Sequence, residues 1–288
     1  MKDENNFRVE HFVRQSKRIL KPYLHDYGLV LYSHRSTLRK NPVLFYGINP
    51  GYDPSKTRDH PITWKIGDSL DYFVDGFSNV RKAISAKAEG LPNSERLHSD
   101  CNLIDDQFWP RPSLKGDHPT GRAPYQNHTR NMLLSIGHGG ALITNLLFLQ
   151  AAKPKEIGKE LKGRKYKDFE DACWQVHELI FQITQPRVVV TCSSALNEGL
   201  RKRLKLTLVP PTKNSGYGPE QRKWHCKQWR GSWRCESGNN REIAVCQVPH
   251  MSYYNVQGDY SKKNGVSEWA RTITEAGLKF EECIVPVQ

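Results

Sequence analysis

The sequence has no long hydrophobic run. Its first residues, MKDENN, are polar and do not resemble the apolar core of a signal peptide. The longest apolar run lies at 140–149 and is far shorter than the roughly 20 residues that span a bilayer. We therefore expect a cytoplasmic protein that does not contact a membrane.

Closely paired cysteines are also missing. The seven cysteines are scattered, odd in number and form no Cys-x-x-Cys pair, which argues against a disulfide framework or a zinc ribbon. One loose cluster has spacings that match no common zinc pattern; it consists of His225, Cys226, Cys235, Cys246 and His250. We expect reduced thiols, no metal and no other cofactor.

Acidic residues are scarce relative to basic ones. The 43 lysines and arginines outnumber the 30 aspartates and glutamates, so the formal net charge is +13. Such an excess favours a polyanionic partner, because neutralising phosphates releases condensed counterions. The charge is equally compatible with a basic protein that has no specific partner.

Repeats and low-complexity tracts are absent, and predicted strands alternate with predicted helices. The strands are apolar almost throughout, which is typical of a parallel sheet covered on both faces; they lie at 43–46, 141–144, 187–191 and 243–248. The helices are predicted at 7–23, 70–88, 125–136, 168–185, 194–204 and 266–276. This alternation predicts an α/β fold with three α/β/α layers and a mostly parallel four-stranded central sheet.

The long connections between strands predict one domain, 1–288, with insertions at about 52–140 and 209–241. Within 213–234, aromatic residues alternate with lysines and arginines. The aromatic members are Tyr217, Trp224, Trp229 and Trp233. We interpret the segment either as a nucleic-acid surface or pocket wall, or as a small subdomain with buried tryptophans.

The first two predicted strands each end in an asparagine. Asn49 stands in the turn GINPG at 47–51, where glycine and proline permit close approach to a ligand and the amide can hold a water molecule. Asn145 ends the second strand. Its amide offers one acceptor and two donors, which suits the edge of a pyrimidine, although asparagines here also cap turns.

The other two strands end in hydroxyl groups and an imidazole. Ser193 and Ser194 precede a helix, where hydroxyls and free N–H groups bind phosphate or form an ordinary N-cap. His250 can stabilise a developing anion. Tyr253 and Tyr254 follow it, and such aromatics either enter a base stack or pack on the domain.

In this order the four segments resemble the uracil-DNA glycosylase superfamily. GINPG at 47–51 looks like the catalytic motif of its mismatch-specific and single-strand-selective branches. ALITNL at 141–146 resembles the strand that ends in the base-reading asparagine, and VTCSSA at 190–195 is similar to the phosphate-gripping loop. HMS at 250–252 resembles the His-Pro-Ser loop that precedes the intercalating residue. The resemblance spans about residues 40–275.

The chain also departs from that pattern. Met251 stands where the family has proline, and Tyr253 and Tyr254 stand where it has a short aliphatic wedge. Tyr52 and Trp64 both compete for the aromatic that stacks on the base. The cysteine ligands of the iron–sulfur members are missing.

The resemblance implies a monofunctional DNA glycosylase. Asn49 would position the attacking water, His250 would stabilise the departing base and Asn145 would read it. Ser193 and Ser252 would hold the flanking phosphates. No lysine in the motifs matches a Schiff-base nucleophile.

The resemblance favours a uracil-like base, whereas the insertions favour a bulky modified cytosine. A hydroxymethylated or glucosylated cytosine of phage DNA would imply an antiviral function. We expect a monomer that binds DNA without an obligate protein partner. The alternative is a catalytically weak or inactive module that recognises damaged or abasic DNA.

Overall fold

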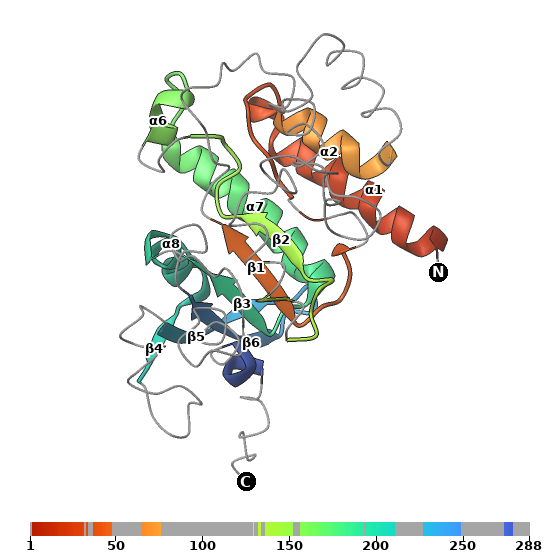
Figure 1. Ribbon diagram of the computed structural model, residues 1–288. Coiled ribbons are helices and arrows are strands. Elements are labelled where there is room, and N and C mark those ends of the chain that lie inside the picture. The colour runs from red at the N-terminus through yellow and green to blue at the C-terminus, as the bar shows by residue number, and fades with distance from the viewer. Residues whose placement is uncertain are drawn as a thin grey trace, which may run out of the picture. The chain divides into compact units, whose positions relative to one another are not determined.

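The computed structural model of the 288-residue chain describes residues 2–31, 33, 37–47, 65–75, 129, 132–133, 136–151, 156–192, 194–210, 227–248 and 274–278. The chain divides into two compact units (Figure 1). The first comprises Met1–Arg39, Ile48–Arg122 and Leu142–Ile183. The second comprises Lys40–Gly47, Ala123–Ala141 and Thr184–Gln288.

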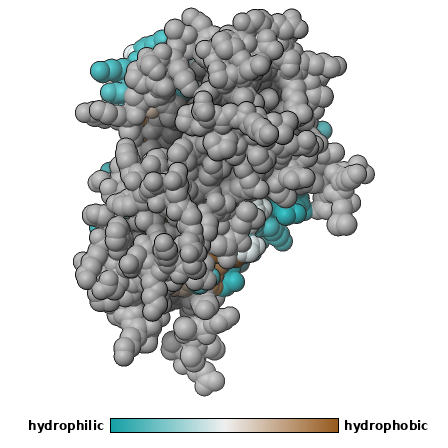
Figure 2. Space-filling model, in the orientation of Figure 1, coloured by the Kyte–Doolittle hydropathy of each residue, from teal (hydrophilic) through white to brown (hydrophobic). Residues whose placement is uncertain are grey.

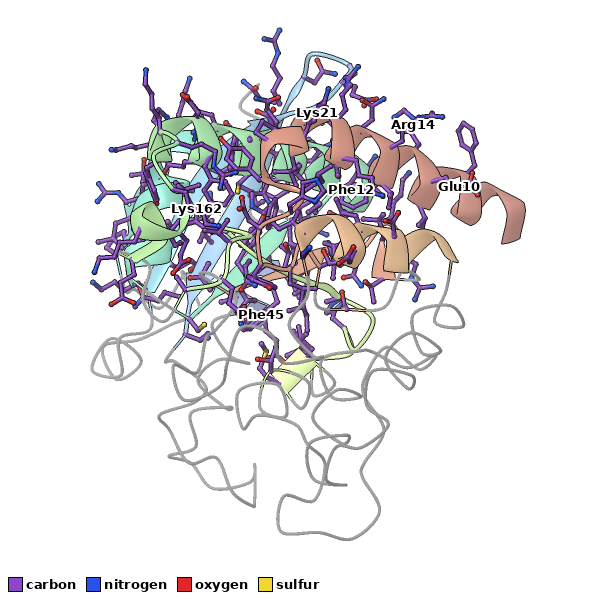
Figure 3. The ribbon with its side chains drawn as sticks, turned by 90° about the horizontal axis from the view of Figure 1, so that it is seen from above. Glu10, Phe12, Arg14, Lys21, Phe45 and Lys162 are labelled. Carbon is purple, nitrogen blue, oxygen red and sulfur yellow. The ribbon has the colours of Figure 1, made fainter. Side chains whose placement is uncertain are left out.

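The first unit contains a packed pair of helices, α1 (Lys2–Ile19) and α2 (Ile66–Asp75). The buried residues of α1 recur at helical spacing, which gives the helix one apolar face; they are Val9, Phe12, Val13 and Ser16. Phe12 lies on this buried side, whereas Glu10 and Arg14 are exposed (Figure 3). Lys17 forms an ion pair with Asp71, which joins the two helices.

The other elements of the first unit are the 3-10 helix η1 (Lys21–Tyr23), strand β2 (Leu142–Asn145), the short helix α6 (Ile157–Glu160) and helix α7 (Tyr166–Thr184). In α7 the buried residues follow the stripe that the sequence predicts; they include Phe169, Ala172, Cys173, Val176 and Ile180. The helix begins two residues earlier than the predicted range 168–185. It ends at Thr184, and Gln185, which has a positive φ of 49°, follows just before Pro186.

The second unit contains five of the six strands of the sheet. They are β1 (Val43–Gly47), β3 (Val188–Thr191), β4 (Thr207–Val209), β5 (Lys227–Arg234) and β6 (Asn240–Gln247). Their order is β1-β3-β6-β5-β4. The pairs β1–β3 and β3–β6 are parallel, whereas β5 pairs antiparallel with both β6 and β4. Every residue of β1 and β3 is buried, as a strand covered on both faces requires.

The α/β class is confirmed, but the expected four strands are wrong because the structure has six. Of the two extra strands, β4 ends at the first residue of the segment 209–241 that we interpreted as an insertion, and β5 lies within it. The buried residues of β5 are Gln228, Trp229 and Trp233, so the strand lacks the period-two alternation that would mark it in the sequence. Trp229 and Trp233 are 7% and 6% exposed, so the interpretation as a nucleic-acid surface is wrong for them.

The remaining predicted helices agree in place where they are described. Helix α8 (Ser194–Leu204) has the predicted bounds. The described residues 274–276 of the predicted helix 266–276 are helical, and the helix continues to 278. Residues 129, 132, 133 and 136 of the predicted helix 125–136 are described; the first three are helical, and Ile136 lies in a turn. The sequence did not predict α6. The three-layer arrangement stays a prediction.

The described surface carries few large hydrophobic side chains. On the face that Figure 2 shows, the described residues are mainly hydrophilic. Phe7, Tyr166 and Leu208 are exposed, and each belongs to a different element, which is usual for isolated apolar residues. No helix among the described residues is long and apolar enough to cross a membrane.

Candidate functional site

Most of the predicted site residues lie outside the described part of the chain. For Ser194 the structure describes the backbone, which begins α8, but not the side chain. The site residues outside the described ranges are Asn49, Tyr52, Trp64, Ser193, His250, Ser252, Tyr253 and Tyr254. The structure therefore bears on this site through the strand ends and through Asn145.

Three parallel strands of the second unit end level with one another. Tyr46 in β1 is in register with Thr191 in β3, which is in register with Gln247 in β6. The amide of Val248 donates to the carbonyl of Thr191 over 2.7 Å, so the pairing continues one residue past β6. The sequence correctly predicts that these strands share one carboxyl edge, where ligands bind in open α/β sheets.

The predicted motifs follow these three strand ends closely in the chain. Asn49 comes two residues after Gly47, the last residue of β1. Ser193 comes two residues after the end of β3, and His250 comes three residues after the end of β6. The chain thus leaves the sheet at one edge immediately before each motif residue.

Asn145, the last residue of β2 in the first unit, is the one predicted site residue whose side chain is described. It is 5% exposed. Its amide nitrogen Nδ2 is buried and donates to no acceptor among the residues that the structure describes. An unmet buried donor costs about 1–3 kcal/mol, so most proteins avoid one unless a ligand or water completes the bond. This half of the amide takes no part in capping a turn.

Buried polar side chains hold the backbone of β2 in place. The amide of Ile143 donates to Ser33 Oγ over 2.8 Å, and Ser33 Oγ lies 2.7 Å from Thr37 Oγ1. Thr144 Oγ1 donates to the carbonyl of Val30 over 2.6 Å. These bonds hold the two residues before Asn145 in place, one through the side chain of Ser33 and the other through the backbone carbonyl of Val30.

His177 of α7 holds the residue that follows Asn145. The imidazole is fully buried, and its Nε2 lies 2.9 Å from the carbonyl oxygen of Leu146. Its ring packs against those of Phe148 and Trp174, at centroid distances of 5.0 and 6.0 Å. Burial lowers the pKa of His177 to about 4, although the bond to Leu146 opposes this shift. The imidazole is therefore neutral at pH 7 and donates its Nε2 hydrogen.

The sequence analysis did not single out His177. In the sequence, His177 lies on the apolar stripe of the helix predicted at 168–185. It follows Cys173 by four residues and precedes Ile180 by three. A polar residue at such a position must find a hydrogen-bond partner. Nothing in the sequence indicates that this partner is the carbonyl next to Asn145.

The loose cysteine and histidine cluster is described only in part. Cys235 is half-buried and Cys246 is buried, and neither forms a disulfide. Within the described ranges, no three histidine, cysteine or acidic side chains gather as metal ligands would. His225, Cys226 and His250 lie outside those ranges.

Comparisons with known proteins do not identify a relative. No protein-family model matches the chain, and no curated protein sequence matches it significantly. The functional argument therefore depends on the residues themselves and on their geometry.

Proposed function

We propose that this protein is a monofunctional DNA glycosylase. It flips a modified pyrimidine out of DNA and hydrolyses its N-glycosidic bond, which leaves an abasic site. We expect it to act as a monomer. The proposal takes its residue roles from the resemblance of the four strand-end motifs to the uracil-DNA glycosylase superfamily.

The observation that carries the proposal is the unmet donor of Asn145. A buried amide nitrogen with no acceptor has a free-energy cost that a bound ligand removes. A pyrimidine presents carbonyl oxygen and ring nitrogen acceptors at its edge, which an asparagine amide complements. Ser33, Thr144 and His177 restrain the strand that carries this amide, so the donor is held ready for the base.

The common edge of β1, β3 and β6 supports the same function. Asn49, Ser193 and His250 follow these strands in the order of the family motifs. A water-holding amide, a phosphate-binding hydroxyl and an imidazole are the groups that hydrolysis of a flipped nucleotide requires. The basic net charge of +13 suits a DNA substrate.

Flipping requires that the enzyme offset the loss of base stacking. Unstacking one base costs on the order of a few kcal/mol. Tyr253 or Tyr254 would fill the gap in the stack, since base–aromatic stacking contributes roughly 1–3 kcal/mol. Tyr52 or Trp64 would stack on the flipped base, while Ser193 and Ser252 would bind the neighbouring phosphates.

The chemical step breaks the bond between C1′ of the sugar and the base nitrogen. The bonding electron pair leaves with the base, and the sugar acquires oxocarbenium character. Asn49 orients the water whose oxygen bonds to C1′ and whose proton is released. His250 stabilises the negative charge on the departing base, where one well-placed donor contributes roughly 3 kcal/mol.

We propose a uracil-like base or a bulky modified cytosine as the substrate. A hydroxymethylated or glucosylated cytosine would be a marker of phage DNA, and its removal would serve antiviral defence. Mass spectrometry of bases freed from DNA that carries a panel of modified pyrimidines tests both. Release of uracil but of no modified cytosine would contradict the defence function.

The Asn49→Ala variant tests the enzymatic assignment. We expect base release to fall about 10²- to 10³-fold while DNA binding persists, because only the positioned water is lost. Treatment of the unmodified protein and its substrate with borohydride should trap no covalent adduct. If the unmodified protein releases no base from any duplex yet binds abasic DNA, the non-catalytic module is the correct function.

A further inference from the structure

The second unit contains a groove of about 300 Å³ that the proposed base excision does not use. It is lined by residues of β4, β5 and the first half of β6, and by Arg187 just before β3. Figure 1 labels these strands. Ala244, at its floor, is in register with Val188, the first residue of β3. The groove is thus at the amino end of these parallel strands, whereas the proposed catalytic motifs follow their carboxyl ends.

Strand register places the polar side chains of the groove on one face of the sheet. Thr207, Arg230 and Ala244 are direct neighbours across β4, β5 and β6. Ser232 pairs with Glu242 two residues further along the same two strands. Because side chains alternate between faces with a period of two, both rows point to the same side.

Two further cations complete the lining. Lys205 follows α8 and is exposed, and Arg187 precedes β3 and is half-buried. One terminal nitrogen of Arg187 donates to the carbonyl of Leu278 over 3.0 Å, which restrains the plane of its guanidinium. A restrained guanidinium loses little rotamer entropy when it binds an anion.

The packing around Gly277 shapes one wall of the groove. A Cβ on Gly277 would lie 3.1 Å from Cys246 Sγ and 3.3 Å from Ala244 Cβ. The helical segment 274–278 therefore packs closely against the sheet at a residue without a side chain, where an added Cβ would require its neighbours to shift by a few tenths of an ångström.

Three cationic side chains and two hydroxyls face one carboxylate, so the groove favours an anion. Arginine fits phosphate oxygens with paired donors, and serine and threonine hydroxyls add single donors. The volume is at the lower end for small-ligand sites, which suits a phosphate group with a small attached residue. We propose that this groove binds a phosphate group, carried either by a free nucleotide or by a nucleic-acid strand.

Calorimetric titration with inorganic phosphate, thymidine 5′-monophosphate and a single-stranded oligonucleotide tests the proposal. We expect Arg230→Gln to raise the phosphate Kd about tenfold, and Lys205→Gln, at an exposed position, about threefold. Glu242→Gln should lower it about threefold, because the carboxylate among the described lining residues is neutralised. Arg234→Gln is the matched control, since Arg234 lies on the same strand but does not line the groove.

The size of the Arg230→Gln effect identifies the source of the phosphate. A larger loss for the oligonucleotide than for the mononucleotide indicates a strand, and the reverse indicates a free nucleotide. No saturable phosphate binding, or equal effects of Arg230→Gln and Arg234→Gln, would overturn the proposal. Base release from short substrates is measured in parallel. We expect these variants to release the base as the unmodified protein does, so a failure of the phosphate proposal can be told apart from a failure of the proposed base excision.

Discussion

The two units each contain a strand with a buried side-chain amide that lacks a hydrogen-bond partner. In β2 of the first unit, the Nδ2 donor of Asn145 is unmet. In β5 of the second unit, both Nε2 and Oε1 of Gln228 are unmet, and the residue is 0% exposed. The chemistry is the same, but the positions in the strands differ.

Asn145 is the last residue of its strand, whereas Gln228 is the second residue of β5 and lies between two neighbouring strands. Gln228 has Val209 on one side and Cys246 on the other. A strand end can present its amide to a ligand, but an amide between two paired strands has apolar neighbours on both sides. We infer that the unmet donor of Asn145 serves binding, whereas the unmet amide of Gln228 only lowers the stability of the fold.

Replacing each amide by an apolar side chain of similar size separates these two inferences. For Asn145→Leu we expect base release to fall about 10²- to 10³-fold, because the donor to the base is lost. The free energy of unfolding should stay level or rise, since the unmet polar group is removed as well. Undiminished base release by a folded variant would show that Asn145 does not read the base.

The second test concerns the support of Asn145 by His177. The pKa of His177 is lowered to about 4, from 6.5 in an unfolded chain, so the unfolded state binds the proton first as pH falls. The stabilising contribution is complete above pH 6.5 and is lost between pH 6.5 and about 4. At 1.36 kcal/mol per pKa unit, the loss amounts to about 3 kcal/mol.

Chemical denaturation at several pH values measures this contribution. The unmodified protein should lose stability over that window, and His177→Gln should lose about 3 kcal/mol less, because glutamine does not titrate. Glutamine also retains a donor that can reach the carbonyl of Leu146. Parallel pH profiles of the two proteins would contradict the assignment.

The smallest expected effect is that of Gln228→Met. Methionine has a similar length and no polar group to leave unmet, so we expect the free energy of unfolding to rise by about 1 kcal/mol. Base release should not change. A loss of base release with raised stability would place Gln228 in the functional site and remove the contrast with Asn145.

The positions of strands β1, β2, β3 and β6 could be predicted from the sequence, because residues buried on both faces of a parallel sheet are apolar throughout. The bounds of helix α8 could be predicted as well. The sequence also placed Asn145 at the end of its strand. Strand β5 escaped prediction because its buried residues do not alternate. Gln228 and Trp229 are buried next to each other, and three partly exposed residues separate them from Trp233.

Which buried polar groups have hydrogen-bond partners could be seen only in the folded structure. Residues 110 positions apart, Ser33 and Ile143, share a hydrogen bond, and His177 reaches Leu146 across 31 positions. The phosphate groove likewise depends on strand register, which brings Arg230 beside Thr207 and Ala244. Composition and periodicity describe a few neighbouring residues at a time. These hydrogen-bond and strand partners instead depend on packing between segments that are remote in the chain.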